Sequence, residues 1–191
     1  MVGSEEVIAL GNLLEAQAVE WKDEPFMLSH GAPSNWYVDV RKVMMTHEGA
    51  RLAGQVMVAG AETLGLEYNS LMAMGLGGRA VMFTMQIANP NLYTIEVNPD
   101  NDPKDRYPYG LLGAPVTEAT RILEIDDTGT TGGSLVKMLD IAKEFGAEVS
   151  QVLNLVDRSQ GAVSERLTKL SVTYHFLYEF DETDGSIKPQ F

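Results

Sequence analysis

The sequence predicts an α/β fold, a doubly wound parallel sheet flanked by helices. Short apolar runs alternate along the chain with segments whose apolar residues recur at helical spacing, as in parallel sheets with right-handed crossovers. Three of these runs end directly in glycine-rich or charged turns, at 75–79, 126–134 and 157–158. Because ligands bind at the carboxyl ends of parallel strands, we expect the three turns to meet at one site.

The composition is that of a soluble globular protein, with 45% hydrophobic and 21% charged residues among 191. The absence of cysteine excludes disulfides and thiolate metal sites and favours a reducing compartment, so we expect a cytoplasmic protein. No apolar run reaches the length of a membrane span, and the acidic N-terminus is unlike a signal peptide, so no membrane partner is expected. The formal net charge of −13 argues against nucleic acid as a partner.

The first elements are a helix and a pair of strands. Ser4 is the predicted N-cap of the helix, and the Glu24-Pro25 break ends this unit. The strands flank a turn at 31–35, and an edge hairpin is an alternative explanation that the pattern alone does not exclude. We expect strands at 25–28, 36–40, 70–74, 92–97, 119–125, 149–156 and 172–178, helices at 47–64, 80–88, 135–145 and 163–170, and a loosely held tail at 181–191.

The most informative stretch is ILEIDDTGTTGGSL, residues 122–135. An apolar strand is followed by Asp126 and Asp127, then by seven residues that are all Thr, Gly or Ser, and then by a helix that Gly146 would stop. Glycines let a ligand approach the backbone, and successive N–H groups at a helix N-terminus bind anions. The segment contains no lysine, so it does not match the loop of nucleotide triphosphatases.

These residue types suit a bound monophosphate, held by backbone N–H groups and hydroxyls. The two acids are then placed for sugar hydroxyls or for a divalent metal such as Mg²⁺. Helix capping alone would explain one hydroxyl and one glycine, but it leaves the two acids and the remaining residues unexplained. The glycine turn at 75–79 is weaker evidence, because tight turns use the same residues. Residues 98–110 contain three prolines and predict a long exposed loop.

Three stretches resemble the orotate phosphoribosyltransferases. The two acids and TGTTGGS resemble the phosphoribosyl-pyrophosphate (PRPP) signature of type I phosphoribosyltransferases. The segments 26–41 (FMLSHG and SNWYVDVR) and 156–162 (VDRSQGA) resemble the F-x-L-x-S-G…S…Y-x-D-x-R and V-D-R-x-x-G-A motifs of the orotate enzymes. The three matches occur in the family's order and span most of the chain.

The resemblance implies a single phosphoribosyltransferase-like domain over 1–191, with a small hood (about 1–42 and the C-terminal part) and a lid at about 98–110. It implies transfer of the phosphoribosyl group of PRPP to orotate, with Mg²⁺, in a homodimer. Catalysis and metal binding fall to Asp126 and Asp127, and orotate binding to Thr130, Arg158 and Phe26. The PRPP-binding residues that it implies are Asp126, Asp127, Thr128, Gly129, Thr130, Thr131, Gly132, Gly133, Ser134 and, for pyrophosphate, Arg79.

The lid departs from the resembled family. An R-K-x-x-K-x-H cluster is usual there, whereas residues 94–100 here contain two acids and no cation. Lys104 and Arg106 are the remaining lid cations, so they complete the predicted catalytic set. The alternative is a non-catalytic phosphoribosyl- or nucleotide-binding protein that has lost the lid cations.

Overall fold

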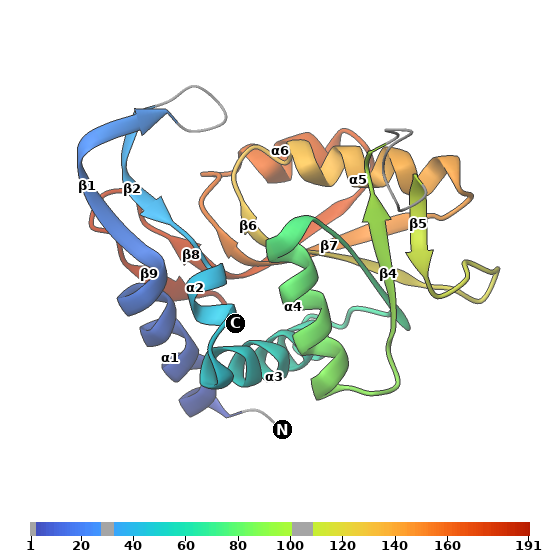
Figure 1. The fold of residues 1–191 in the computed structure, drawn as a ribbon, viewed down its shortest axis with the longest axis horizontal. Helices are drawn as coiled ribbons and strands as arrows, with labels where there is room; N and C mark the ends of the chain where they lie inside the picture. Colours follow the sequence, from blue (N-terminus) through green and yellow to red (C-terminus); the bar gives the residue numbers. More distant parts are fainter. Residues whose placement is uncertain (1–2, 28–32, 101–108) are drawn as a thin grey trace.

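The computed structural model describes residues 3–27, 33–100 and 109–191 (Figure 1). Its centre is a seven-stranded sheet with the order β5-β4-β3-β6-β7-β8-β9. The five inner strands are parallel and the two edge strands, β5 and β9, are antiparallel to their neighbours, which confirms the predicted α/β class. The strands are β3 (Ser70–Met74), β4 (Tyr93–Asn98), β5 (Gly110–Gly113), β6 (Ile122–Gly129), β7 (Val149–Asp157), β8 (Thr173–Phe180) and β9 (Ile187–Pro189).

The order of the sheet reverses between β3 and β6. The chain proceeds outward from β3 to β4 in one direction and from β6 through β7 to β8 in the other. Such a reversal leaves a crevice at the carboxyl ends of the two strands, because their following connections diverge to opposite faces. The turns after β3 and β6 are two of the three turns that the sequence analysis singled out.

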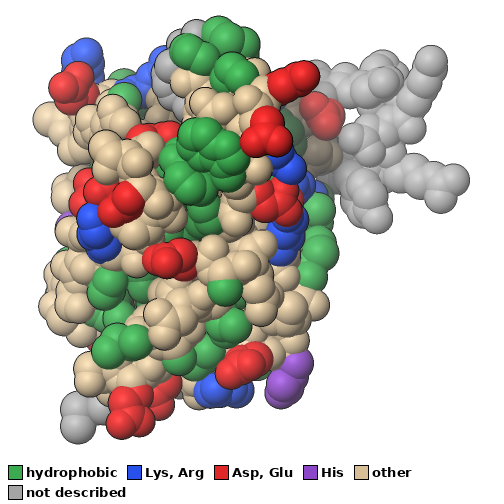
Figure 2. Space-filling view, turned by 90° about the vertical axis from the view of Figure 1, so that its left-hand side faces the viewer, with side chains coloured by type: hydrophobic (Ala, Val, Ile, Leu, Met, Phe, Trp, Pro, Cys, Tyr) green, Lys and Arg blue, Asp and Glu red, His purple; other side chains and the backbone are tan. Residues whose placement is uncertain are grey.

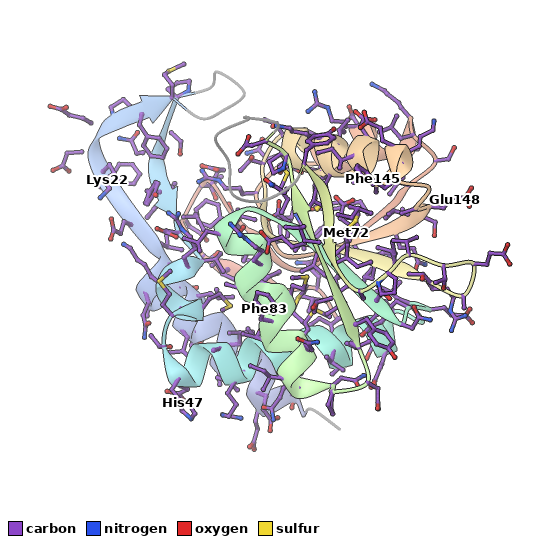
Figure 3. The ribbon with its side chains drawn as sticks, turned by 45° about the vertical axis from the view of Figure 1, so that its right-hand side comes forward. Lys22, His47, Met72, Phe83, Phe145 and Glu148 are labelled. Carbon is purple, nitrogen blue, oxygen red and sulfur yellow. The ribbon has the colours of Figure 1, made fainter. Side chains whose placement is uncertain are left out.

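Helices cover both faces of the sheet (Figure 1). One face is covered by α1 (Ser4–Leu13), the π-helical turn η1 (Leu14–Ala18), α2 (Arg41–Met44), α3 (His47–Thr63) and α4 (Gly75–Ala88), and the other by α5 (Gly133–Glu144) and α6 (Ala162–Thr168). Alternate residues of each strand enter opposite cores, so Leu71 packs with the first group and Met72 with the second. Figure 3 shows Met72 at the central sheet.

A second, two-stranded sheet, the hood sheet, consists of β1 (Val19–Met27) and β2 (Pro33–Val38). The expected break at Glu24-Pro25 is wrong, since β1 continues through it. The register shifts between Trp21 and Phe26, and such an irregularity tolerates a residue without an N–H. Lys22 lies on the outer side of this arm (Figure 3). The predicted turn at 31–35 lies partly outside the described residues.

Four other expectations are corrected. Gly3, rather than Ser4, is the N-cap of α1, and its N–H donates to Glu6 Oε2 at 2.8 Å. Helix α4 begins at Gly75 rather than at Ala80, and β5 has no counterpart in the predicted strands. The tail is held rather than loose. It forms β9 against β8, buries Ile187 to 6% exposure, and donates Gln190 N–H to Leu177 O at 2.9 Å.

In the described part of the chain, no helix combines the length and the apolar character needed to cross a membrane. Figure 2 shows the face that carries β1, where acidic side chains are interspersed with basic and apolar ones. Trp21 (56% exposed) and Met27 (65%) belong to the apolar side chains of this strand. The net charge of −13 is therefore not gathered into one acidic block on this face.

Candidate active site

A cavity of about 290 Å³ opens at the sheet reversal, beneath the hood sheet. It collects five of the predicted site residues from three separate segments of the chain. Residues of the hood sheet, of the turn after it and of the start of α4 complete the walls. The lining residues are Phe26, Tyr37, Val38, Asp39, Arg41, Leu76, Gly77, Asp127, Thr128, Thr130 and Arg158.

The two adjacent acids at the end of β6 have different environments. Asp126 is buried, with Oδ1 accepting from the Asp127 N–H at 3.0 Å and Oδ2 accepting from Ser134 Oγ at 3.2 Å. Burial, followed by the charge of Asp127, raises the pKa of Asp126 well above its usual range. Asp127 instead lines the cavity. Burial raises its pKa as well, but the nearby Arg41 opposes that effect. Asp127 is therefore the acid that a ligand in the cavity meets.

Gly77 at the start of α4 accommodates Asp127. A Cβ atom at Gly77 would lie 2.3 Å from the Asp127 carboxyl carbon and 2.3 Å from its Oδ1. This separation is shorter than the contacts that Cβ atoms make, so a side chain at residue 77 would displace the Asp127 carboxylate from its observed position. The glycine turn after β3 thus has a definite role at the reversal, namely to leave room for this carboxylate.

The segment 128–134, called the phosphate loop below, has three glycines in three different environments. Gly132 has φ +69° and ψ 13°, which favours glycine, and it is the N-cap of α5. Gly129 belongs to β6, and a Cβ there would lie 2.3 Å from Tyr174 Oη, so packing rather than ligand approach requires it. Gly133 has neither a positive φ nor a close neighbour. The expectation that all three glycines let a ligand approach the backbone stays a prediction.

The phosphate loop is braced from α6. Arg166 Nη1 donates to Thr131 O at 2.8 Å, directly before the left-handed Gly132. Arg166 also lines a neighbouring cavity of about 520 Å³ together with Thr130 and Thr131. Arg166 is not among the site residues predicted from the sequence, because nothing in its local pattern links α6 to residue 131.

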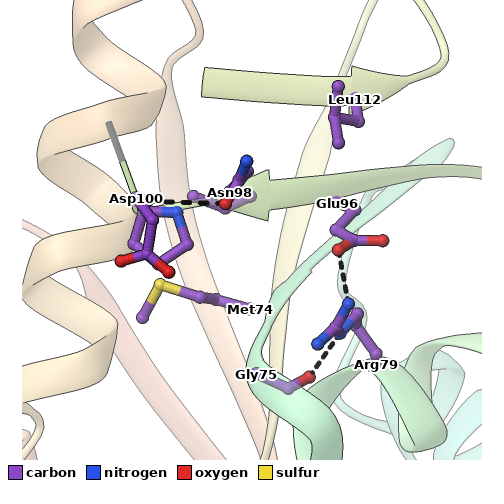
Figure 4. A pocket seen from close by; sticks show the side chains of 9 residues that line it. Met74, Gly75, Arg79, Glu96, Asn98, Asp100 and Leu112 are labelled. Atoms are coloured by element: carbon purple, nitrogen blue, oxygen red, sulfur yellow. Dashed lines mark hydrogen bonds and ion pairs between the residues drawn. The ribbon is translucent and has the colours of Figure 1, made fainter. Parts of the chain in front are cut away.

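Arg79 lines a second cavity, of about 500 Å³, at the end of β4 (Figure 4). Its Nη1 forms an ion pair with Glu96 Oε1 at 2.5 Å, and its Nε donates to Gly75 O at 2.8 Å. Asp100 adds a second acid to the lining, whereas Arg79 is the one cation in the described lining. The predicted pyrophosphate contact would therefore require Arg79 to exchange Glu96 for the ligand. Lys104 and Arg106 lie outside the described residues.

Arg158 follows β7 and is 6% exposed. Its Nε donates to Glu182 Oε1 at 3.0 Å, and its Nη2 also pairs with Glu182. Nη2 further donates to Ser34 Oγ at 3.3 Å and Nη1 to Trp36 O at 3.2 Å, so the guanidinium joins β7, the hood sheet and the turn after β8. Arg158 lines the cavity, at the strand end where the sequence predicts it, but no sequence motif indicates Glu182 as its partner.

Comparisons with known proteins agree with this geometry. Over 162 residues, the chain is 32% identical to an orotate phosphoribosyltransferase of Streptomyces avermitilis, and the match covers 81% of this chain and 85% of the relative. This chain belongs to the orotate phosphoribosyltransferase family. No family model matches it.

Two solved structures of the Mycobacterium tuberculosis orotate phosphoribosyltransferase share the fold. The complex with Fe(III) dicitrate is 26% identical, with a TM-score of 0.72 and coverage of 90% of this chain and 94% of that chain. The complex with PRPP is 24% identical, with a TM-score of 0.71 and the same coverage. The sheet reversal and the helices on both faces are thus features of the orotate phosphoribosyltransferase fold.

Asp39 and Arg41 are wall residues whose role the motif match did not reveal. Arg41 Nε and Nη2 donate to the two oxygens of Asp39, at 2.7 and 2.8 Å, in a bidentate pair. Hydrogen bonding to Arg41 lowers the pKa of Asp39. Arg41 also interacts electrostatically with Asp127, so the pair places a cation in the wall of the cavity that Asp127 lines.

The donor set suits a metal that is held mainly by substrate. In residues 3–27, 33–100 and 109–191 no group of three or more His, Cys, Asp or Glu could hold a metal ion. Both oxygens of Asp126 accept internal hydrogen bonds, and Asp127 alone of the two lines the cavity. Mg²⁺ keeps several waters and uses one or two carboxylates together with substrate oxygens, which matches one carboxylate that lines the cavity.

Glu124 on β6 is a fully buried acid, and both carboxyl oxygens lack a hydrogen-bond partner among the described residues. Burial raises its pKa well above the usual value, so the folded protein prefers the protonated form. The stability that this group contributes is present below the unfolded pKa of about 4.5 and is lost as the pH rises toward the folded pKa.

We expect Glu124→Gln to raise the free energy of unfolding at pH 7 relative to the unsubstituted protein, with the difference disappearing near pH 4. Urea unfolding at pH 4, 5.5 and 7 would measure it. Glu165→Gln, at an exposed position of α6, is the matched control and should change little at any of these pH values. A stability gain that does not depend on pH would contradict the assigned cause.

Gly132→Val is expected to weaken PRPP binding without unfolding the protein. A β-branched residue is strongly disfavoured at φ +69°, so the turn would move and the N–H groups at the start of α5 would lose their alignment. Calorimetric titration with PRPP would measure the loss. Gly133→Ala, at a position without positive φ or a close neighbour, serves as the control. Equal PRPP affinity in a folded Gly132→Val protein would remove the proposed role of the loop.

Proposed function

We propose that this chain transfers the phosphoribosyl group of PRPP to orotate, producing orotidine 5′-monophosphate and pyrophosphate. The observation that carries the proposal is the convergence of Asp127, the phosphate loop and Arg158 on one cavity at the sheet reversal. Membership of the orotate phosphoribosyltransferase family and the PRPP complex of the M. tuberculosis relative support it.

The phosphate loop binds the 5′-phosphate of PRPP in this proposal. The N–H groups that begin α5 point away from the helix, and the positive end of the helix dipole favours the anion. The hydroxyls of Thr130 and Thr131 add uncharged hydrogen-bond donors, whereas that of Ser134 donates to Asp126 Oδ2. Arg166 fixes the loop through Thr131 O, so the phosphate is held by a preformed turn.

The reaction breaks the bond between C1 of the ribose and the pyrophosphate oxygen, and forms a bond from C1 to N1 of orotate, which loses its proton. Positive charge develops on C1 as the leaving bond lengthens. Asp127 stabilises that charge, and its position at the carboxyl end of β6 holds it toward the cavity. Bound Mg²⁺, held by Asp127 and substrate oxygens, would supply further neutralisation of the pyrophosphate.

Arg158 and Phe26 bind orotate in the proposal. Arg158 offers a fixed guanidinium, stacked 5.1 Å from the centre of the Phe180 ring, toward the base carboxylate. Phe26 lines the same cavity from the hood sheet. We also propose that residues 1–191 act as one domain, with a lid at about 98–110, in a cytoplasmic homodimer.

A non-catalytic binding protein is the second candidate. The observation that favours it is the pairing of Arg79 with Glu96. The lining where pyrophosphate would depart then contains two acids, Glu96 and Asp100, and one cation whose charge is already neutralised. The deciding experiment follows the absorbance of orotate with the purified protein, PRPP and Mg²⁺, and with PRPP omitted as the control. PRPP-dependent loss of orotate supports the enzyme, whereas tight PRPP binding without any loss supports the binding protein.

A further inference from the structure

The guanidinium of Arg158 already holds a carboxylate, which belongs to Glu182 in the turn between β8 and β9. Glu182 Oε1 accepts from both Nε and Nη2 of Arg158, and Glu182 Oε2 lies 3.2 Å from Ser34 Oγ. An internal side chain therefore occupies the position on Arg158 where an external carboxylate would make two parallel hydrogen bonds.

A donor count shows what this pairing leaves. A guanidinium has five N–H donors. Nε and both donors of Nη2 are used by Glu182 and Ser34, and one donor of Nη1 is used by Trp36 O. One N–H remains, whereas a bidentate pair needs two. A base carboxylate can reach Arg158 in that geometry only if Glu182 leaves.

The turn that carries Glu182 is anchored independently of its carboxylate. Trp36 Nε1 donates to Glu182 O at 3.1 Å, and Gly185, with φ +75°, packs so closely against the Trp36 ring that a Cβ would lie 2.6 Å from it. Asp181 Oδ1 accepts from the Thr183 N–H at 2.9 Å and fixes the turn locally. The Glu182 side chain is 20% exposed, while that of Arg158 is 4% exposed. Rotation of Glu182 toward solvent thus needs no movement of the turn.

We propose that Glu182 is a specificity-determining residue that competes with the carboxylate of the base for Arg158. The inference rests on the proposed function, since it takes Arg158 as the site of the base carboxylate. A carboxylated ligand must replace the Arg158–Glu182 ion pair with an ion pair of the same kind. Its binding free energy therefore includes only the difference in energy between the two ion pairs. A ligand without a carboxylate leaves the Arg158–Glu182 pair intact and meets no competition.

The test compares orotidine 5′-monophosphate with uridine 5′-monophosphate, which differ only in the base carboxylate. Calorimetric titration of each nucleotide measures binding alone, so the result does not depend on turnover. Glu182→Gln retains the length of the side chain but removes its charge. We expect it to tighten orotidine 5′-monophosphate roughly tenfold, about the ratio between a charge-assisted and a neutral hydrogen bond, and to leave uridine 5′-monophosphate unchanged.

Glu179→Gln is the matched control, because it removes the same charge from an exposed position of β8. It should change the affinity of neither nucleotide. An unchanged or weakened affinity of Glu182→Gln for orotidine 5′-monophosphate would overturn the inference, as would equal tightening of both nucleotides. Failure of both nucleotides to bind either protein would overturn it as well.

The outcomes separate this inference from the proposed function. A protein that shows no orotate-dependent turnover, but whose Glu182→Gln variant gains affinity for the carboxylated nucleotide alone, refutes the enzyme and supports the competition. If thermal unfolding shows that Glu182→Gln does not fold, Glu182→Asp replaces it. The shorter acid keeps the charge but cannot reach both nitrogens equally well, so a smaller selective gain is expected, and no gain would overturn the inference.

Discussion

Asp127→Asn is expected to lower kcat by roughly 10²–10³-fold, the loss observed when one group that stabilises transition-state charge is removed. Of the two adjacent acids, Asp127 lines the cavity, whereas both carboxyl oxygens of Asp126 accept internal hydrogen bonds. Asparagine has nearly the same shape, so PRPP should still enter. Steady-state kinetics with PRPP varied would show a fall in kcat with little change in KM.

The same substitution should not destabilise the protein. Because burial raises the pKa of Asp127, its charge costs stability at neutral pH, and the uncharged amide is expected to leave the melting temperature unchanged or higher. Asp140→Asn, at an exposed position of α5, removes the same charge away from the cavity and serves as the control. Full activity in a folded Asp127→Asn protein would refute the assignment of Asp127 to the reacting centre.

The double substitution of Lys104 and Arg106 to Ala is expected to reduce turnover by a similar factor, roughly 10²–10³-fold. Pyrophosphate leaves with concentrated negative charge. In the described lining of the cavity beside β4, Arg79 is paired with Glu96, and Asp100 adds a further acid. Some other cation must then meet the leaving group, and these two are the lysine and arginine of the 98–110 segment.

Orotate affinity should be spared in this variant, because the proposed base contacts lie at Arg158 and Phe26. A matched control replaces Lys137 and Lys143, two exposed lysines of α5, by Ala and removes the same net charge. Pyrophosphate release followed by a coupled assay would give both rates. If the double variant and its control turn over equally fast, Lys104 and Arg106 are not needed for turnover. Neutralisation of pyrophosphate would then be explained by Arg79 exchanging Glu96 for the leaving group.

The sequence determined the parallel strands and most helices, because their signals are local. The strand 70–74 was predicted with its observed bounds, and the helix 47–64 differs from α3 by one residue. Gly146 stops α5 with φ +76° as expected, since only the backbone conformation of that residue is involved. Two of the wrong expectations, the break in β1 and the loose tail, concern segments whose order depends on pairing with another strand: β1 pairs with β2, and β9 pairs with β8.

The candidate site divides in the same way, into features that local sequence motifs predict and features that only the tertiary structure decides. The acids, the phosphate loop and Arg158 could be named from the sequence, since each belongs to a short motif at the end of a predicted strand. What these residues face was decided by the tertiary structure alone. Glu182 reaches Arg158 across 24 positions of chain and Arg166 reaches Thr131 across 35. Such contacts depend on how strands and helices pack, and no periodic pattern in the sequence around either residue indicates them.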